Sequence, residues 1–98
     1  MADGVNVKVK FFASLREKLG TKEVDIRLSD GCTVRTLLKH LTEKFGRPFK
    51  EYVFNEKGEI KEYILILVNG LSVHQLKGLD TELKSGDSVA ILPPVSGG

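Results

Sequence analysis

Residues 33–45, TVRTLLKHLTEKF, contain the main helical pattern of the sequence. The apolar residues recur at three- and four-residue intervals, so they share one stripe of an α-helix. Thr33 can cap the first turn, and Gly46 and Pro48 predict where the helix ends. One apolar stripe needs one sheet face to cover it, so this segment predicts a helix packed on one side of a sheet. The residues of the stripe are Val34, Leu37, Leu38, Leu41 and Phe45.

Two stretches before this helix alternate apolar and polar residues, which is the period of a β-strand with one buried face. Residues 5–11, VNVKVKF, form the first stretch, and residues 24–28, VDIRL, form the second. Between them, residues 13–19 predict a short helix that ends at Gly20. The two strands can therefore pair antiparallel ahead of the main helix.

The part after the main helix predicts three more strands. Residues 63–68, YILILV, are continuously apolar, and we expect a central strand covered on both faces, or nearly so. Asn69–Gly70 is typical of a tight hairpin turn into a short strand at residues 71–73. Residues 88–92 form the last strand, whereas residues 47–61 show no clear pattern.

The predicted order is strand, strand, helix, strand, strand, strand. The first and last strands are apolar enough to lie side by side in the centre of the sheet, and the crossover through the helix should be right-handed. This order predicts an α+β protein of the β-grasp type, a mixed sheet of about five strands curled around one main helix. Residues 1–92 form this domain, and residues 93–98 form an extended, flexible C-terminal tail.

The composition limits the possible partners. The chain has 98 residues and a net charge of +2, which suits one domain and argues against a nucleic-acid or membrane partner. The longest apolar run, residues 63–68, is too short to span a bilayer, and residues 1–4, MADG, lack the regions of a signal peptide. We therefore expect a cytoplasmic protein.

Few residues predict chemistry within the domain. Cys32, the one cysteine, precedes the main helix, where a thiol can have a lowered pKa. It has no base or second cysteine nearby in the sequence, so we interpret it as a small side chain that fills space. His40 and His74 lie far apart, and we expect both at the surface. We expect no metal site and no stably bound cofactor.

The last six residues, PPVSGG, have a different character. Pro93 and Pro94 favour a stiff, extended segment that projects away from the sheet. Gly97 and Gly98 have no side chains, so the backbone of another protein can close tightly around them. Such a tail can present its terminal carboxylate inside a narrow channel; the alternative is a disordered end without function.

Two segments resemble the small subunit of molybdopterin synthase. They are residues 7–20, VKVKFFASLREKLG, and residues 86–98, GDSVAILPPVSGG, whose Pro-Pro-x-x-Gly-Gly ending is the hallmark of that family. The turn at residues 68–70 also falls where that family has it. More distantly, the chain resembles the sulfur carriers of the thiamine pathway and ubiquitin-like modifiers.

This resemblance implies a ubiquitin-like sulfur carrier and no enzyme on its own. An E1-like enzyme would use ATP and magnesium to adenylate the Gly98 carboxylate. A sulfur donor protein would convert the adenylate to a thiocarboxylate, and the tail, with Gly97, would thread into the large subunit of the synthase. Conjugation to lysines through Gly98, a carrier role in tRNA or thiamine thiolation, an interaction module and an enzyme built on Cys32 remain alternatives.

Phe12 is the candidate anchor for a partner. It breaks the strand alternation, because a large aromatic side chain falls where a polar one is expected. It can pack on the short helix, or, as the resemblance implies, it can bind a partner together with Arg16. Further candidates lie along the path to the tail and in it. They are Leu71, Leu92, Pro93, Pro94, Val95 and Ser96.

Overall fold

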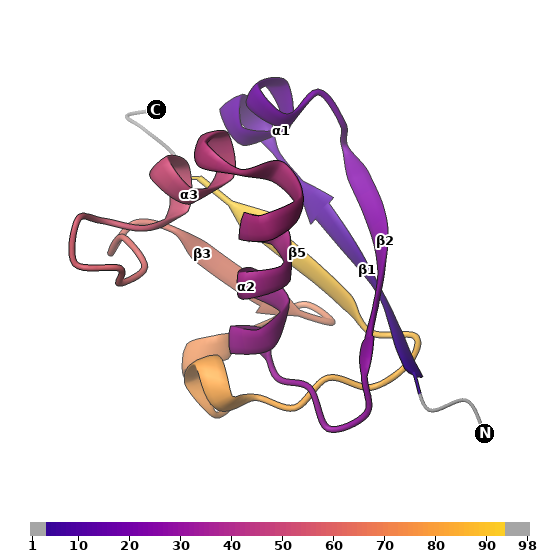
Figure 1. Cartoon of the computed structure of the whole chain (residues 1–98). Helices are drawn as coiled ribbons and strands as arrows, with labels where there is room; N and C mark the ends of the chain where they lie inside the picture. The colour runs from indigo at the N-terminus through magenta and orange to yellow at the C-terminus, as the bar shows by residue number, and fades with distance from the viewer. Residues whose placement is uncertain (1–3, 94–98) are drawn as a thin grey trace.

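The computed structural model describes residues 4–93, which form a five-stranded mixed sheet and three α-helices. The strands are β1 (Gly4–Phe11), β2 (Glu23–Ser29), β3 (Leu65–Val68), β4 (Leu71–Ser72) and β5 (Ser88–Leu92). The helices are α1 (Ala13–Leu19), α2 (Val34–Phe45) and α3 (Arg47–Val53), with 3-10 turns η1 (Val73–Gln75) and η2 (Gly78–Asp80). In Figure 1, α2 lies across one face of the sheet, and no described helix covers the opposite face.

The strand order is β2-β1-β5-β3-β4, with the first and last strands adjacent as predicted. β1 pairs antiparallel with β2 from Gly4↔Ser29 onward and parallel with β5 from Lys8↔Ser88 onward. β3 pairs antiparallel with both β5 and β4. This topology confirms the β-grasp prediction.

The predicted stripes form the core between α2 and the sheet. Every second residue of β1 is buried, from Val5 to Phe11, and these side chains meet the apolar stripe of α2. Phe45 packs edge-on against Phe11, with ring centroids 5.6 Å apart. Each fully buried valine or leucine side chain in this core stabilises the fold by about 1.5–3 kcal/mol.

The ends of α2 are fixed by local chemistry. Thr33 caps the helix, since its hydroxyl accepts a hydrogen bond from the Thr36 amide at 3.4 Å, and the Thr36 hydroxyl accepts one from the Thr33 amide at 3.3 Å. Gly46, at φ 74°, ends the helix as predicted. Pro48 does not end it, because Pro48 lies in the first turn of α3, where a missing N–H costs nothing.

The apolar run at residues 63–68 differs from the expectation. Only Leu65–Val68 forms a strand, and it is next to the edge strand of the sheet. Ile66 is buried toward α2, whereas Leu65 is 39% exposed on the opposite face and Tyr63 is 55% exposed. The expectation of a strand covered on both faces was therefore wrong: the second face of β3 is apolar but open.

Candidate functional site: an apolar sheet face beside the tail

Phe12 continues the alternation of β1 onto the face of the sheet that α2 does not cover. Its backbone is extended, at φ −131° and ψ 155°, just before α1 begins. Phe11 is buried toward α2, so Phe12 points the opposite way and remains 38% exposed. The expectation that Phe12 is an exposed aromatic residue is confirmed.

The sheet register sets two leucines in line with Phe12. β1 and β5 run parallel with Phe11↔Ile91, so the next step along both chains brings Phe12 beside Leu92. Leu92 is the antiparallel partner of Leu65 on β3. These three side chains form a row across β1, β5 and β3.

A second row of side chains lies on the same face, two residues away along each strand. Leu67 pairs with Ala90, and Ala90 pairs with Lys10, whose charge marks the polar limit of the apolar area. Beside Lys10 the open face is charged: Glu23, the cross-strand partner of Lys10, forms an ion pair with Lys8 at 3.4 Å. We call the apolar area the open-face patch; it consists of Phe12, Leu65, Leu67, Ala90 and Leu92.

The other predicted partner residues have different positions. Arg16 is exposed on α1, one helical turn after Phe12, and its amide donates to the Phe12 carbonyl at 3.4 Å. Leu71 is exposed but pairs with Val68, whose side chain is buried on the α2 side, so Leu71 does not extend the patch. Pro93 directly follows Leu92. The remaining tail residues lie outside the described residues: Pro94, Val95, Ser96, Gly97 and Gly98.

Leu65, Leu67 and Ala90 were missed by the sequence reasoning. Leu65 and Leu67 were hidden in the run that was interpreted as a strand with two buried faces. The available signal was that the sequence predicts one main amphipathic helix, which can cover only one face of the sheet. The strictly alternating burial of β3 places both leucines on the open face.

Cys32 has the environment of a packing residue. It is 4% exposed, its amide donates to the Ser29 carbonyl at 3.2 Å, and its carbonyl accepts from the Leu83 amide at 3.0 Å. Burial raises the pKa of the Cys32 thiol, and the nearby carboxylates of Asp30, Asp87 and Glu82 raise it further. A thiol of this kind is a poor nucleophile at neutral pH.

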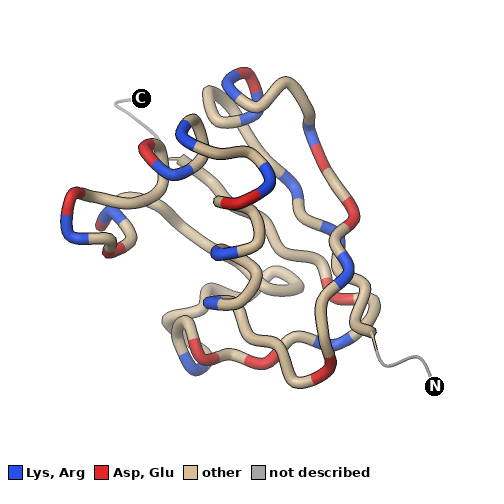
Figure 2. Tube along the Cα trace, viewed as in Figure 1, with Lys and Arg blue, Asp and Glu red and all other residues tan. Residues whose placement is uncertain are grey.

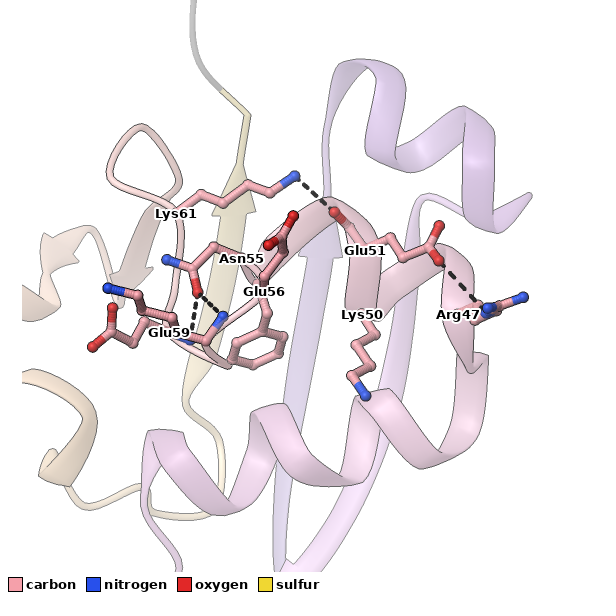
Figure 3. Close-up of a pocket in the computed structure, with 9 residues that line it drawn as sticks. Arg47, Lys50, Glu51, Asn55, Glu56, Glu59 and Lys61 are labelled. Atoms are coloured by element: carbon pink, nitrogen blue, oxygen red, sulfur yellow. Dashed lines mark hydrogen bonds and ion pairs between the residues drawn. The ribbon is translucent and has the colours of Figure 1, made fainter.

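A hollow of about 790 Å³ lies beside α3 and the loop that follows it. Figure 3 shows that its polar groups bind one another: Arg47 pairs with Glu51 at 3.5 Å, and the Lys61 ammonium donates to the Glu51 carbonyl at 2.7 Å. The side-chain oxygen of Asn55 accepts hydrogen bonds from the amides of Lys57 and Glu59 and so fixes the shape of the loop. The lining of the hollow contains both acidic and basic side chains.

Charge and metal-binding groups are dispersed in the described structure. Figure 2 shows basic and acidic residues interspersed along the trace. Within residues 4–93, no three His, Cys, Asp or Glu side chains come together as a metal site. None of the helices in that range has the length and apolar character needed to cross a bilayer.

The fold and the open-face patch together define a ubiquitin-like β-grasp protein with an exposed apolar face at the end of its last strand. The model of the ThiS family matches residues 9–98, and the chain belongs to that family. The match covers residues 9–20 of the first segment that suggested the resemblance and all of the second, residues 86–98.

The relatives include proteins named as modifiers and proteins named as sulfur carrier subunits. Small archaeal modifier protein 3 of Haloferax volcanii is 35% identical over 94 residues, which are 96% of this chain and 100% of that protein. The molybdopterin synthase sulfur carrier subunit of Drosophila melanogaster is 36% identical over 100 residues, covering 99% and 98% of the two chains. The crystal structure of SAMP1 from Haloferax volcanii matches with a TM-score of 0.85 at 31% identity, covering 95% of this chain and 99% of that chain. The predicted resemblance is thereby confirmed at the level of the family.

Proposed function

We propose that this chain is a sulfur carrier that delivers sulfur as a thiocarboxylate on Gly98. An E1-like enzyme uses ATP and Mg²⁺ to adenylate the Gly98 carboxylate. A sulfur donor protein supplies sulfur to the acyl carbon, and AMP leaves. The large subunit of molybdopterin synthase then binds the loaded tail, and the sulfur passes to a pterin precursor.

The position of the open-face patch carries this proposal. Leu92 belongs to the patch and is the last residue of β5, and Pro93 follows it directly. A partner that covers Phe12, Leu92 and Leu65 therefore also meets the first residue of the tail. Aromatic and aliphatic side chains grouped in this way are the usual anchors of a protein interface.

The division of labour follows from the chemistry. A free carboxylate is a poor electrophile, and adenylation gives it a good leaving group. The thiocarboxylate that results is a soft nucleophile at neutral pH. The proposal requires no acid, base or bound cofactor from this chain, because the adenylating partner binds the nucleotide and the magnesium. We also propose a cytoplasmic location, where ATP is available.

Intact-mass spectrometry tests the proposal. The chain is incubated with the adenylating enzyme of its native host, ATP, Mg²⁺ and a sulfide source. We expect the mass increase of one oxygen-to-sulfur exchange at Gly98, which disappears when ATP is omitted. An unchanged mass, with an adenylating enzyme that is active on its own control carrier, would contradict the proposal.

Protein modification is the second candidate, and the relative named as a small archaeal modifier protein favours it. The same adenylated Gly98 would then be attacked by a lysine amine, which forms an isopeptide bond and releases AMP. Immunoblots of native lysates separate the two roles. Ladders of conjugates that vanish when Gly97 and Gly98 are deleted support modification, and a single band at the size of the free chain supports the carrier role alone.

A further inference from the structure

β2 is an open edge of the sheet. It pairs only with β1 among the described strands, and Figure 1 shows no described segment beyond it. The strand is seven residues long and contains no proline, so its outer backbone groups are available to a further strand. An edge of this length is a ready template for another extended chain.

The hydrogen bonds to β1 show which peptide groups face outward. The Phe11 amide donates to the Lys22 carbonyl at 2.9 Å in an antiparallel ladder, so the even-numbered residues of β2 bond to β1. The N–H and C=O groups of Asp25 and Arg27 therefore point to the open edge. The Glu23 carbonyl, by contrast, already accepts the Thr21 hydroxyl at 3.0 Å.

The exposed side chains of this edge have opposite charges. Asp25 and Arg27 lie on the open face of β2, and neither has an ion-pair partner within the described part of the chain. The Arg27 side chain instead lies over Gly4, where an added Cβ would come within 2.5 Å of its Nε. It can turn outward across the edge, because it is exposed and long.

These charges favour one way of pairing β2 with itself. An antiparallel pair with a two-fold axis at Ile26 sets Asp25 opposite Arg27 of the second copy, and Arg27 opposite Asp25. The neighbouring registers that also align the outward peptide groups have their axis at Asp25 or Arg27, and each sets that residue opposite its own copy, with like charges face to face. The axis at Asp25 would also set Glu23 opposite Arg27, but Glu23 already forms an ion pair with Lys8 at 3.4 Å. On the α2 side, the same register sets Ile26 opposite itself and Val24 opposite Leu28, so that apolar residues meet.

We propose that β2 pairs antiparallel with β2 of a second copy of this chain, with the two-fold axis at Ile26. The joined sheets share four main-chain hydrogen bonds between Asp25 and Arg27 and two cross-strand ion pairs. The contact is small for a protein interface, so the dimer dissociates on dilution. Because β1 separates β2 from β5, each copy keeps its open-face patch and its tail free for partners.

Charge reversal tests the register. Sedimentation of the full chain over a concentration series is expected to show a monomer–dimer equilibrium that weakens with salt. Asp25→Arg and Arg27→Asp should each shift the chain to monomer, because they set like charges opposite each other. The double variant Asp25→Arg/Arg27→Asp should restore the dimer. Glu43→Arg, on the exposed side of α2, is the matched control and should leave the equilibrium unchanged.

A second measurement locates the contact. Amide hydrogen exchange at Asp25 and Arg27 should slow as the protein concentration rises, whereas exchange at the other open edge should not. Circular dichroism confirms that each variant is folded. A chain that is monomeric throughout, a dimer unaffected by the single reversals, or a double variant that stays monomeric would overturn the proposal. Thiocarboxylate formation should be unaffected in all variants, so the proposed function is tested separately.

Discussion

At the scale of single residues, a substitution of Phe12 can show whether its side chain packs within the fold or binds a partner. Its side chain is 38% exposed and lies outside the buried core, so truncating it leaves no cavity between the sheet and α2. Phe12→Ala should weaken binding to the proposed partner, the large subunit of molybdopterin synthase, by about 2 kcal/mol or more, the scale of an interface hot spot. The melting temperature should change little. Calorimetric titration of the variant against its partner and a thermal melt measure the two effects.

Leu71→Ala is the control for this substitution. Leu71 is also large, apolar and 49% exposed, but it lies outside the open-face patch. We expect partner binding to be unchanged. If Phe12→Ala destabilises the fold while binding is retained, Phe12 is a packing residue; if both variants weaken binding equally, the interface is larger than the patch.

Cys32 should be dispensable for sulfur transfer. The thiol is buried, its pKa is raised by that burial, and it lies in a turn among backbone groups. Cys32→Ser should therefore form the thiocarboxylate at the wild-type rate in a reconstituted assay. A folded variant that no longer forms it would show that the chemistry is not confined to the tail.

The raised pKa of the Cys32 thiol predicts that the stability of the fold depends on pH. Because the thiol pKa is higher in the folded chain than in the unfolded chain, folding favours the protonated form. The stabilisation is complete below the ordinary thiol pKa and is lost as the pH rises through the raised value. Urea unfolding should show a fall in stability in this alkaline range that is absent from Cys32→Ser. An identical profile for both proteins would contradict this account.

At the scale of elements, β3 has two faces with opposite roles. Leu65 faces the open side at 39% exposure, whereas its neighbour Ile66 is 2% exposed against the core. Leu65→Ser should leave the free energy of unfolding within about 0.5 kcal/mol of the wild type, since it is a surface change, and should weaken partner binding. Ile66→Ala should lower the free energy of unfolding by about 2–5 kcal/mol.

Denaturant titrations and binding measurements on both variants check this contrast. The pair is informative because the two residues are adjacent in the chain and similar in size. Equal destabilisation by both substitutions would mean that the open face of β3 is covered, as the continuous apolar run first suggested.

The elements that could be predicted from the sequence are those in which apolar and polar residues alternate regularly. β1 and α2 each face the core on one side and solvent on the other, so their alternation and stripe are visible in the residues. α3 could not be predicted, because Pro48 is equally compatible with the end of one helix and the first turn of the next. The open face of β3 was hidden for a related reason: an exposed apolar face has the same composition as a buried one.

The candidate site was predictable to a similar extent. Phe12 was found because it violates a pattern, and Leu92 because it precedes the tail. Leu65 and Leu67 join them only through pairing between β3 and β5, which are separated by the loop and the turns η1 and η2. Leu71 was expected to extend the patch toward the tail, but the hairpin at Asn69 and Gly70, both with positive φ, pairs it with Val68 and so sets it on the other side of the sheet.

At the scale of the whole molecule, the sheet separates three tasks. One face packs on α2 and stabilises the fold, the opposite face has the open-face patch, and β5 leads from the centre of the sheet into the tail. The open edge at β2 is two strands away from β5. Self-association at β2 and partner binding at the patch can therefore occur at the same time.

The reach of the tail gives the last prediction. Five residues follow Pro93, and an extended chain spans at most about 3.3–3.6 Å per residue, so the Gly98 carboxylate can lie no more than about 18 Å beyond Pro93. Deleting Gly98 brings the carboxylate about 3.5 Å short of its position in a partner's active site. Gly97→Leu keeps the carboxylate but adds a side chain where a narrow channel has room only for backbone. Both variants should fold normally, bind through the open-face patch and act as inhibitors of the wild-type chain.

Pyrophosphate exchange with the adenylating enzyme reports the reaction directly. We expect the rate to be lost for the chain without Gly98 and for Gly97→Leu. A Ser96→Ala variant is the control, because it keeps the length of the tail and both glycines. Phe12→Ala should instead raise the concentration of chain needed for half-maximal exchange, since it weakens docking without changing the reactive end. If the chain without Gly98 is adenylated as fast as the intact chain, the double glycine is not the reactive end, and the sulfur-carrier proposal fails.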